Sequence, residues 1–232
     1  IIDEADEMLS EGFKEQVRIL FGFLTEKCQI GLFSATMDPE VIELTKHFMN
    51  NPNRILMDKE MVTLDGIEQY FVYCEQDANK FAVIDDLYNR LNSAQTIIFC
   101  NSKQRVRDLD SFLTDRQHST CVIHGDMTTQ ERRDVIRAFR TGSSRILIAS
   151  DLVARGIDIQ GIGCTINFDI PYKFPNYIHR IGRAGRFGRK GITINLTTKK
   201  SQESLKKLEE YWKCEIRRLP SNFEEEFRKI LG

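Results

Sequence analysis

The chain has 232 residues, of which 41% are hydrophobic and 29% are charged, and its formal net charge is -1. With 14 glycines and 5 prolines, this composition is that of a globular chain and excludes a disordered, collagen-like or low-complexity protein. Its longest apolar runs are far shorter than the roughly 18 to 20 residues that span a bilayer, and the opening Ile-Ile-Asp-Glu-Ala-Asp has no pattern of a targeting peptide. We therefore expect no membrane segment, and the length corresponds to about one and a half domains of typical size.

Residues 1–58 are predicted to hold a helix, a strand and a second helix. Apolar residues recur every three or four positions from 6 to 24, which is a helical period, and residues 29–34 form a short apolar run that predicts a buried strand. The Asp-Pro pair at 38–39 indicates a helix start, and this helix should extend to about residue 49. Since a lone parallel strand cannot satisfy its backbone groups or bury both faces, we expect this segment to be the C-terminal remnant of a larger domain.

The rest of the chain is predicted to form one complete α/β domain. Residues 59–66 are polar and turn-prone, which favours a linker there, and residues 67–232 then alternate strands with helices, as in a parallel sheet covered on both faces. The expected strands are 67–73, 96–100, 120–123, 145–149, 164–168 and 193–196, and the expected helices are 80–91, 103–115, 129–139, 176–184 and 201–211.

The distribution of charge and the spacing of the cysteines indicate the kind of partner and the redox compartment. Residues 1–58 carry 5 basic and 11 acidic side chains, whereas 59–232 carry 28 and 23, so the larger part has the basic excess that weakly indicates a polyanionic partner. The 6 cysteines are widely spaced and form no Cys-x-x-Cys pair. They are predicted to be small core residues in a reducing compartment.

Two polar sequences stand at predicted strand ends in the first segment. The tetrad Asp-Glu-Ala-Asp from Asp3 follows an apolar strand, where the first carboxylate could hold Mg²⁺ through water and Glu4 could orient the attacking water of a nucleotide hydrolase. Acidic residues at a helix start also complement the helix dipole, which is the alternative interpretation. Ser34 and Thr36 end the next strand, where their hydroxyls can bond to neighbouring carboxylates or belong to a plain turn.

The most specific pattern is the run His-Arg-Ile-Gly-Arg-Ala-Gly-Arg from 179 to 186. Arg180 and Arg183 can share a flank of the predicted helix, whereas the glycines should end that helix near Gly185 and place Arg186 in a loop. Guanidinium groups converging from two backbone elements suit the oxygens of a transferring phosphoryl group. A solvated basic surface is the alternative.

Further polar loops follow the strands of the second part. Ser150 can bond a phosphate and Asp158 a ribose hydroxyl, although an ion pair between Arg155 and an aspartate would explain the same loop structurally. The His-Gly-Asp-Met run from 124 and the Asn-Ser pair at 101–102 end two further strands. Such loops on one sheet edge can bind a sugar-phosphate backbone without contacting bases.

The order and spacing of these motifs resemble the DEAD-box RNA helicases. The matching runs are Asp-Glu-Ala-Asp, Ser-Ala-Thr, Ile-Ile-Phe-Cys-Asn-Ser, Ala-Arg-Gly-Ile-Asp and His-Arg-Ile-Gly-Arg-Ala-Gly-Arg, and several of the later segments are similar to the initiation factor 4A subfamily. The resemblance covers essentially the whole chain. It implies two RecA-like domains that bind ATP and Mg²⁺ in the cleft between them and bind RNA across both.

The resemblance also implies roles for individual residues. Asp3 and Glu4 match the Mg²⁺ and water-activating motif, and Ser34 and Thr36 match the residues that couple it to the cleft. Further matches are Arg183 and Arg186 as the arginine fingers, Asp158 facing the ATP ribose, His179 linking the domains, and Asn101, Ser102, Gly125, Arg132 and Ser150 as RNA-backbone contacts. In such a helicase, domain closure would bend single-stranded RNA and separate short duplexes.

Partners and setting follow from the same resemblance. An initiation factor 4G-like scaffold is the expected accessory protein, with a cytoplasmic location, or a nuclear one for a relative that acts in splicing or exon marking. DNA helicases with related motifs fit the quoted runs less well.

The sequence departs from its apparent relatives in three places. Ala149-Ser150 stands where they have Thr-Thr, Thr129 stands where they have Gln, and no Gly-x-x-x-x-Gly-Lys-Thr phosphate loop occurs in the 232 residues. We therefore expect the parent protein to be an RNA-dependent ATPase and this chain alone to be inactive. The alternative is a non-enzymatic RNA- or protein-binding scaffold of the same fold.

Overall fold

The computed structural model describes residues 1–9, 13–25, 27–37, 39–57, 66–90, 95–151, 162–185 and 190–231. The chain divides into two compact units, Ile1–Met57 and Asp58–Gly232. Of the predicted linker 59–66, the structure describes only Gly66. Three residues singled out in the sequence analysis also lie outside the described residues: Asp38, Asp158 and Arg186.

The described residues of the first unit form the short helices α1 (Ala5–Met8), α2 (Lys14–Gly22) and α3 (Pro39–Thr45). The strand expected at 29–34 is reduced to a single parallel bridge between Ile2 and Leu32. The single helix expected over 6–24 is also wrong, because Leu9 and Phe13 have non-helical backbone angles. Leu9 and Val17 are nevertheless buried in one cluster, so the apolar period continues across the break and could not reveal it.

The second unit is built on a parallel sheet, as the alternating pattern predicted. Its described strands are β1 (Ile67–Tyr73), β2 (Thr96–Cys100), β3 (Thr120–Ile123), β4 (Ile146–Ser150), β5 (Cys164–Asn167), β6 (Gly191–Thr197) and β7 (Arg217–Arg218). They form a 7-stranded sheet in the order β3-β4-β2-β5-β6-β1-β7, and all the described pairings are parallel. The carboxyl ends of these strands therefore meet at one edge of the sheet.

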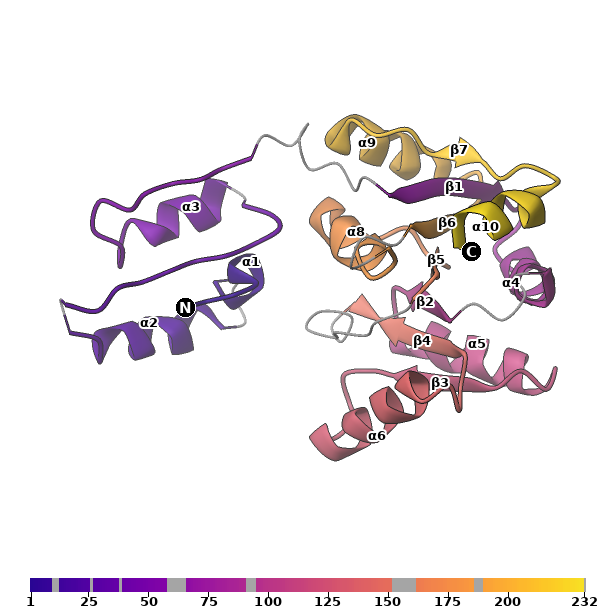
Figure 1. Cartoon of the computed structure of the whole chain (residues 1–232), viewed down its shortest axis with the longest axis horizontal. Coiled ribbons are helices and arrows are strands. Elements are labelled where there is room, and N and C mark those ends of the chain that lie inside the picture. The colour runs from indigo at the N-terminus through magenta and orange to yellow at the C-terminus, as the bar shows by residue number, and fades with distance from the viewer. Residues whose placement is uncertain are drawn as a thin grey trace. The chain divides into compact units, whose positions relative to one another are not determined.

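Helices cover both faces of this sheet (Figure 1). On one face α4 (Asn79–Arg90), α5 (Lys103–Thr114) and α10 (Phe223–Leu231) pack, and on the other α6 (Thr129–Arg140), α8 (Phe174–Ile181) and α9 (Gln202–Trp212). Alternation along β2 explains the two cores, because Ile98 faces the first layer and Phe99 the second. None of the described helices is long and apolar enough to cross a membrane.

Two segments differ from expectation in ways that matter for the site. The helix predicted for 176–184 is α8, which ends at Ile181 with Gly182 as its C-cap, so Arg183 lies in the turn after the helix rather than on its flank. The sequence pattern predicts no element beyond residue 211, but the structure has edge strand β7 and helix α10 there. Phe223 and Phe227 of α10 are buried in the core that α4 and α5 share.

Candidate functional site

The acidic tetrad of the first unit begins in a tight turn between the bridge at Ile2 and α1. Asp3 is exposed, and its Oδ1 accepts a hydrogen bond of 2.9 Å from the backbone N–H of Glu4. Glu4 caps α1 in the left-handed conformation, with φ 51° and ψ 48°, which is a strained backbone for a residue other than glycine. An exposed carboxylate of this kind fits Mg²⁺, which keeps several water ligands when proteins bind it.

Ser34 and Thr36 bind the last member of the tetrad. The Ser34 hydroxyl donates to Oδ1 of Asp6 at 2.7 Å, and the Thr36 hydroxyl donates to Oδ2 at 2.8 Å. The contact between these hydroxyls and a carboxylate is the one that the sequence led us to expect, but Asp6 was missed as a site residue. Its position within the quoted tetrad was the available signal.

At the carboxyl end of β2 in the second unit, Asn101 forms three hydrogen bonds with distant residues. Its backbone N–H donates to Oδ2 of Asp169 at 3.0 Å, its side-chain nitrogen donates to the carbonyl of Ile170 at 2.8 Å, and its Oδ1 accepts from Arg180 at 2.7 Å. The side chain is thus engaged within the protein at both ends. Next to it, exposed Ser102 caps α5 by accepting from the N–H of Arg105.

Arg180 is the centre of this network, although the sequence analysis did not assign it a site role. The residue is fully buried, with 0% of its surface exposed. Its guanidinium binds Asp151 through Nε, Asn167 and the carbonyl of Asp169 through Nη1, and Asn101 through Nη2. These four hydrogen bonds use most of the five N–H donors of the buried guanidinium, so Arg180 has a structural role that joins β2, β5 and α8.

Asp169 connects this network to a charged cluster at the start of α4 and α5. Its carboxylate binds buried Lys80 at 3.3 Å and Arg105 at 2.8 Å, and both cations also bind Asp77. Burial acts to raise the pKa of Asp77, but hydrogen bonds from Arg105 and Lys80 outweigh it and hold that pKa below its ordinary value.

This lowered pKa has a testable consequence. A carboxyl group with a lowered folded-state pKa stabilises the protein above its unfolded pKa of about 3.9, and the contribution is lost as the pH falls through the folded value. We expect Asp77→Asn to lower the free energy of unfolding at pH 6, with a difference from wild type that shrinks below about pH 4. Urea unfolding at a series of pH values measures this. Asp115→Asn at an exposed carboxylate is the control, and a pH-independent difference would contradict the assignment.

The ends of β3 and β4 and the first turn of α6 hold three buried polar atoms without a hydrogen-bond partner among the described residues. These atoms are Nδ1 of His124, Nε of Arg132 and Oγ of Ser150. Nη2 of Arg132 donates to the carbonyl of Gly125 at 2.8 Å, which ties the loop after β3 to α6. Buried polar atoms without partners are unusual in folded proteins and indicate a place where a ligand can supply them.

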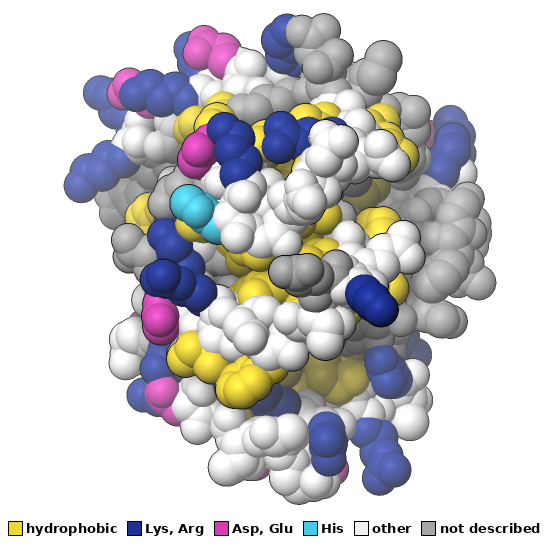
Figure 2. Space-filling view, turned by 90° about the vertical axis from the view of Figure 1, so that its left-hand side faces the viewer, with side chains coloured by type: hydrophobic (Ala, Val, Ile, Leu, Met, Phe, Trp, Pro, Cys, Tyr) yellow, Lys and Arg dark blue, Asp and Glu magenta, His cyan; other side chains and the backbone are white. Residues whose placement is uncertain are grey.

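Two candidate site residues of the arginine run, His179 and Arg183, lie at and just beyond the end of α8. His179 and Arg183 are each 6% exposed, and Nε of Arg183 donates to the carbonyl of His179 at 3.0 Å. Asp158 and Arg186 fall outside the described residues, so their predicted roles stay predictions. In the face drawn in Figure 2, Lys and Arg side chains are spread widely with fewer Asp and Glu side chains among them, as suits a polyanionic ligand.

Comparisons with known proteins show which family the chain resembles. The family model for the helicase conserved C-terminal domain matches residues 79–188, and that for the DEAD/DEAH box helicase matches residues 1–45. The ATP-dependent RNA helicase eIF4A of Eremothecium gossypii is 46% identical over 98% of the chain and 57% of its own length. The chain thus spans a little more than half the length of this curated relative.

Solved structures extend the likeness to the fold. Saccharomyces cerevisiae Dbp5 bound to RNA and ADP BeF3 matches 99% of the chain and 62% of its own length, with 35% identity and a TM-score of 0.93. The C-terminal domain of the DEAD-box protein Dbp5 matches 72% of the chain and 100% of its own length, with 36% identity and a TM-score of 0.66.

Proposed function

The chain belongs to the DEAD-box RNA helicases, and on that premise we propose that it supplies the second-domain RNA surface and part of the nucleotide machinery of an RNA-dependent ATPase. The observation that carries the proposal is the set of unpartnered buried polar atoms at His124, Arg132 and Ser150, on the sheet edge where parallel α/β folds bind ligands. Single-stranded RNA whose backbone crosses this edge would satisfy them.

The RNA surface comprises the loops that follow β2, β3 and β4. Ser102, Gly125, Arg132 and Ser150 would contact phosphates and sugars, whereas Asn101, whose side chain is already engaged, would act by holding its loop in place. Contacts of this kind carry little sequence information, so binding should tolerate many sequences.

The nucleotide machinery would draw on both units. Asp3 would hold Mg²⁺ through water and Glu4 would orient the attacking water, while Ser34 and Thr36 hold Asp6 beside them. Mg²⁺, when bound, neutralises charge on phosphate oxygens. Arg183 and Arg186 would stabilise the charge of the transferring phosphoryl group, Asp158 would bind the ribose, and His179 would link to the first domain.

The finer biological setting belongs to the same proposal. Residues 1–58 would be the part of the first RecA-like domain that carries the acidic tetrad, 59–66 the linker and 67–232 the second domain. Similarity to eIF4A favours duplex unwinding in cytoplasmic translation initiation, with a scaffold partner of the initiation factor 4G type. A nuclear role in splicing or exon marking, or an RNA-binding scaffold without turnover, is the alternative.

Salt dependence of RNA binding tests the proposed surface. We expect the chain to bind unrelated single-stranded RNAs with similar affinity, which falls as salt rises. Because each phosphate contact contributes about -0.7 to the slope of log K against log salt concentration on single strands, Arg132→Ala should reduce that slope by about 0.7. Fluorescence anisotropy measures both, with exposed Arg137→Ala on the same helix as control.

Two outcomes would contradict the function. Binding that is insensitive to salt or selective for one sequence would contradict a backbone-directed surface. RNA-stimulated ATP turnover should appear in the protein expressed from its full reading frame, and its absence there would favour the scaffold without turnover.

A further inference from the structure

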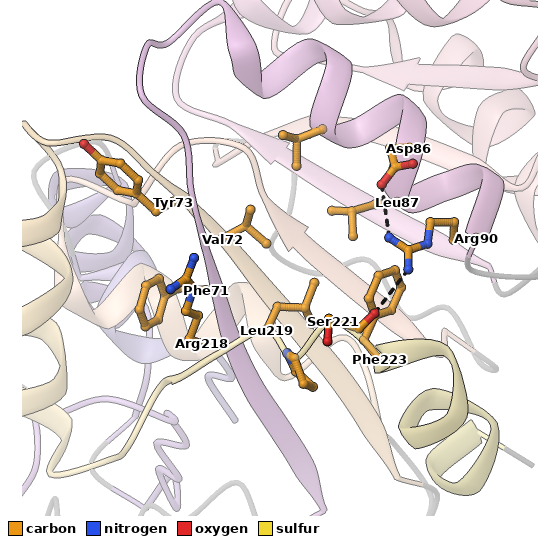
Figure 3. Close-up of a pocket in the computed structure, with 12 residues that line it drawn as sticks. Phe71, Val72, Tyr73, Asp86, Leu87, Arg90, Arg218, Leu219, Ser221 and Phe223 are labelled. Carbon is orange, nitrogen blue, oxygen red and sulfur yellow. Dashed lines mark hydrogen bonds and ion pairs between the residues drawn. The ribbon is translucent and has the colours of Figure 1, made fainter.

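A cavity of about 240 Å³ lies at the β7 side of the sheet in the second unit (Figure 3). It lies between the end of β1, helix α4 and the segment that joins β7 to α10, and its apolar lining includes Val72, Val83, Leu87, Leu219 and Phe223. Cavities of about 150 Å³ can hold a benzene molecule, so this one has room for a leucine or phenyl side chain.

The cavity lies beside the last residues of β1, which extend beyond the end of the neighbouring strand β7. β7 pairs with β1 only at Tyr70–Arg217 and Phe71–Arg218, and the N–H of Leu219 then donates to the carbonyl of Phe71 at 2.9 Å. The next residue, Pro220, has no N–H to continue the ladder. β1 itself continues along β6 to Tyr73.

Backbone groups of Tyr73 are consequently exposed on this edge. In a parallel ladder, alternate residues direct their N–H and C=O to the same neighbour, so Tyr73 directs both groups to the side that Phe71 shares with β7. No described residue pairs with them there, since the β1–β7 register stops at Phe71. Phe71 and Val72, from opposite faces of the sheet, both line the cavity, as expected at an open strand edge.

One of the two cations at this edge has no partner among the described residues. Arg90 is paired with Asp86 and Glu224, and Figure 3 shows the Asp86 pair beside the cavity. Arg218 is exposed, and its guanidinium forms no hydrogen bond or ion pair within the part of the chain that the structure describes. Arg218 is therefore a cation without a direct partner, and it lies next to the cavity and the free strand edge.

We propose that this edge is a docking groove for an extended segment of a partner protein that combines acidic and apolar residues. The segment adds as a strand beside Tyr73, places one apolar side chain in the cavity and pairs a carboxylate with Arg218. Backbone hydrogen bonds give such β-augmentation its affinity, and pockets for alternate side chains give it specificity. RNA fits less well, because a sugar-phosphate backbone has no alternating N–H and C=O groups with which to continue the strand ladder beside Tyr73.

A decapeptide of alternating leucine and glutamate, labelled with fluorescein, is the probe. We expect it to bind the whole chain, to slow amide hydrogen exchange at Tyr73, and to lose binding when alternate peptide nitrogens are methylated on the pairing side. Arg218→Glu should weaken binding about fivefold, the order of an exposed ion pair. Lys206→Glu on α9 makes the same charge change at another exposed site and should leave binding unaltered.

Other occupants give distinct results, and each would overturn the proposal. Unchanged exchange at Tyr73, or equal binding of the methylated peptide, would contradict strand addition. Protection of the Tyr73 amide by oligouridine instead of the peptide would assign the edge to RNA. Protection that grows with protein concentration alone, with a dimer in sedimentation, would assign it to a second copy of this chain.

Discussion

Replacing Arg183 by alanine is expected to lower RNA-stimulated ATP turnover by about 10³, the lower end of the range for arginine fingers. The structure places Arg183 in the turn after α8, with its Nε bound to the carbonyl of His179 and its backbone N–H bound to the carbonyl of Arg180. This anchoring limits the orientations of the planar guanidinium, as the stabilisation of a developing phosphoryl charge requires. Because that interaction strengthens in the transition state, kcat should fall much more than KM rises.

The measurement is steady-state ATP hydrolysis with saturating RNA, on the protein expressed from its full reading frame. Arg183→Lys keeps the charge but loses the fork, and we expect it to recover little activity. Arg228→Ala at an exposed position of α10 is the matched control. A folded Arg183→Ala variant with turnover within twofold of wild type would contradict the assignment.

Replacing Arg180 by methionine is expected to destabilise the second unit by about 3 to 5 kcal/mol, the cost of removing one partner from a buried ion pair. The substitution keeps much of the side-chain volume but leaves Asp151 without its cation and Asn101 without a donor. Unpaired polar groups in a buried site carry their full desolvation penalty. Urea unfolding followed by circular dichroism measures the loss.

Two further variants separate this network from a general packing effect. Arg137→Met, at an exposed position of α6, should change stability by no more than about 0.5 kcal/mol. In Arg180→Met/Asp151→Asn, the uncompensated charge is removed, so the double variant should lose less than the sum of the two single losses. Additive losses would show that the two side chains are not coupled.

Much of the fold could be predicted from the sequence because local patterns report burial directly. The run Ile97–Cys100 is apolar throughout, and the parallel sheet contains a strand buried on both faces there, β2. A carboxylate partner was one of two interpretations of the Ser34 and Thr36 hydroxyls, beside a plain turn, and both hydroxyls donate to Asp6.

The short elements could not be predicted in the same way. β7 has two residues and no period of its own, so only its pairing with β1 defines it. The break between α1 and α2 could not be predicted either. Leu9 and Val17, on either side of it, are buried in the same core cluster, so the apolar spacing looks like that of one continuous helix.

The arginine run shows most clearly which features a local sequence pattern cannot predict. From the residues alone it follows that guanidinium groups recur every third residue and that glycines interrupt the helix. The three-dimensional arrangement adds that buried Arg180 pairs with Asp151, 29 residues away in the chain, whereas Arg183 lies beyond the end of α8. Periodicity describes which face of an element is apolar, but the partner of a buried charge depends on which strands are neighbours in the sheet. That order arises from packing between distant segments, so no local window of sequence contains it.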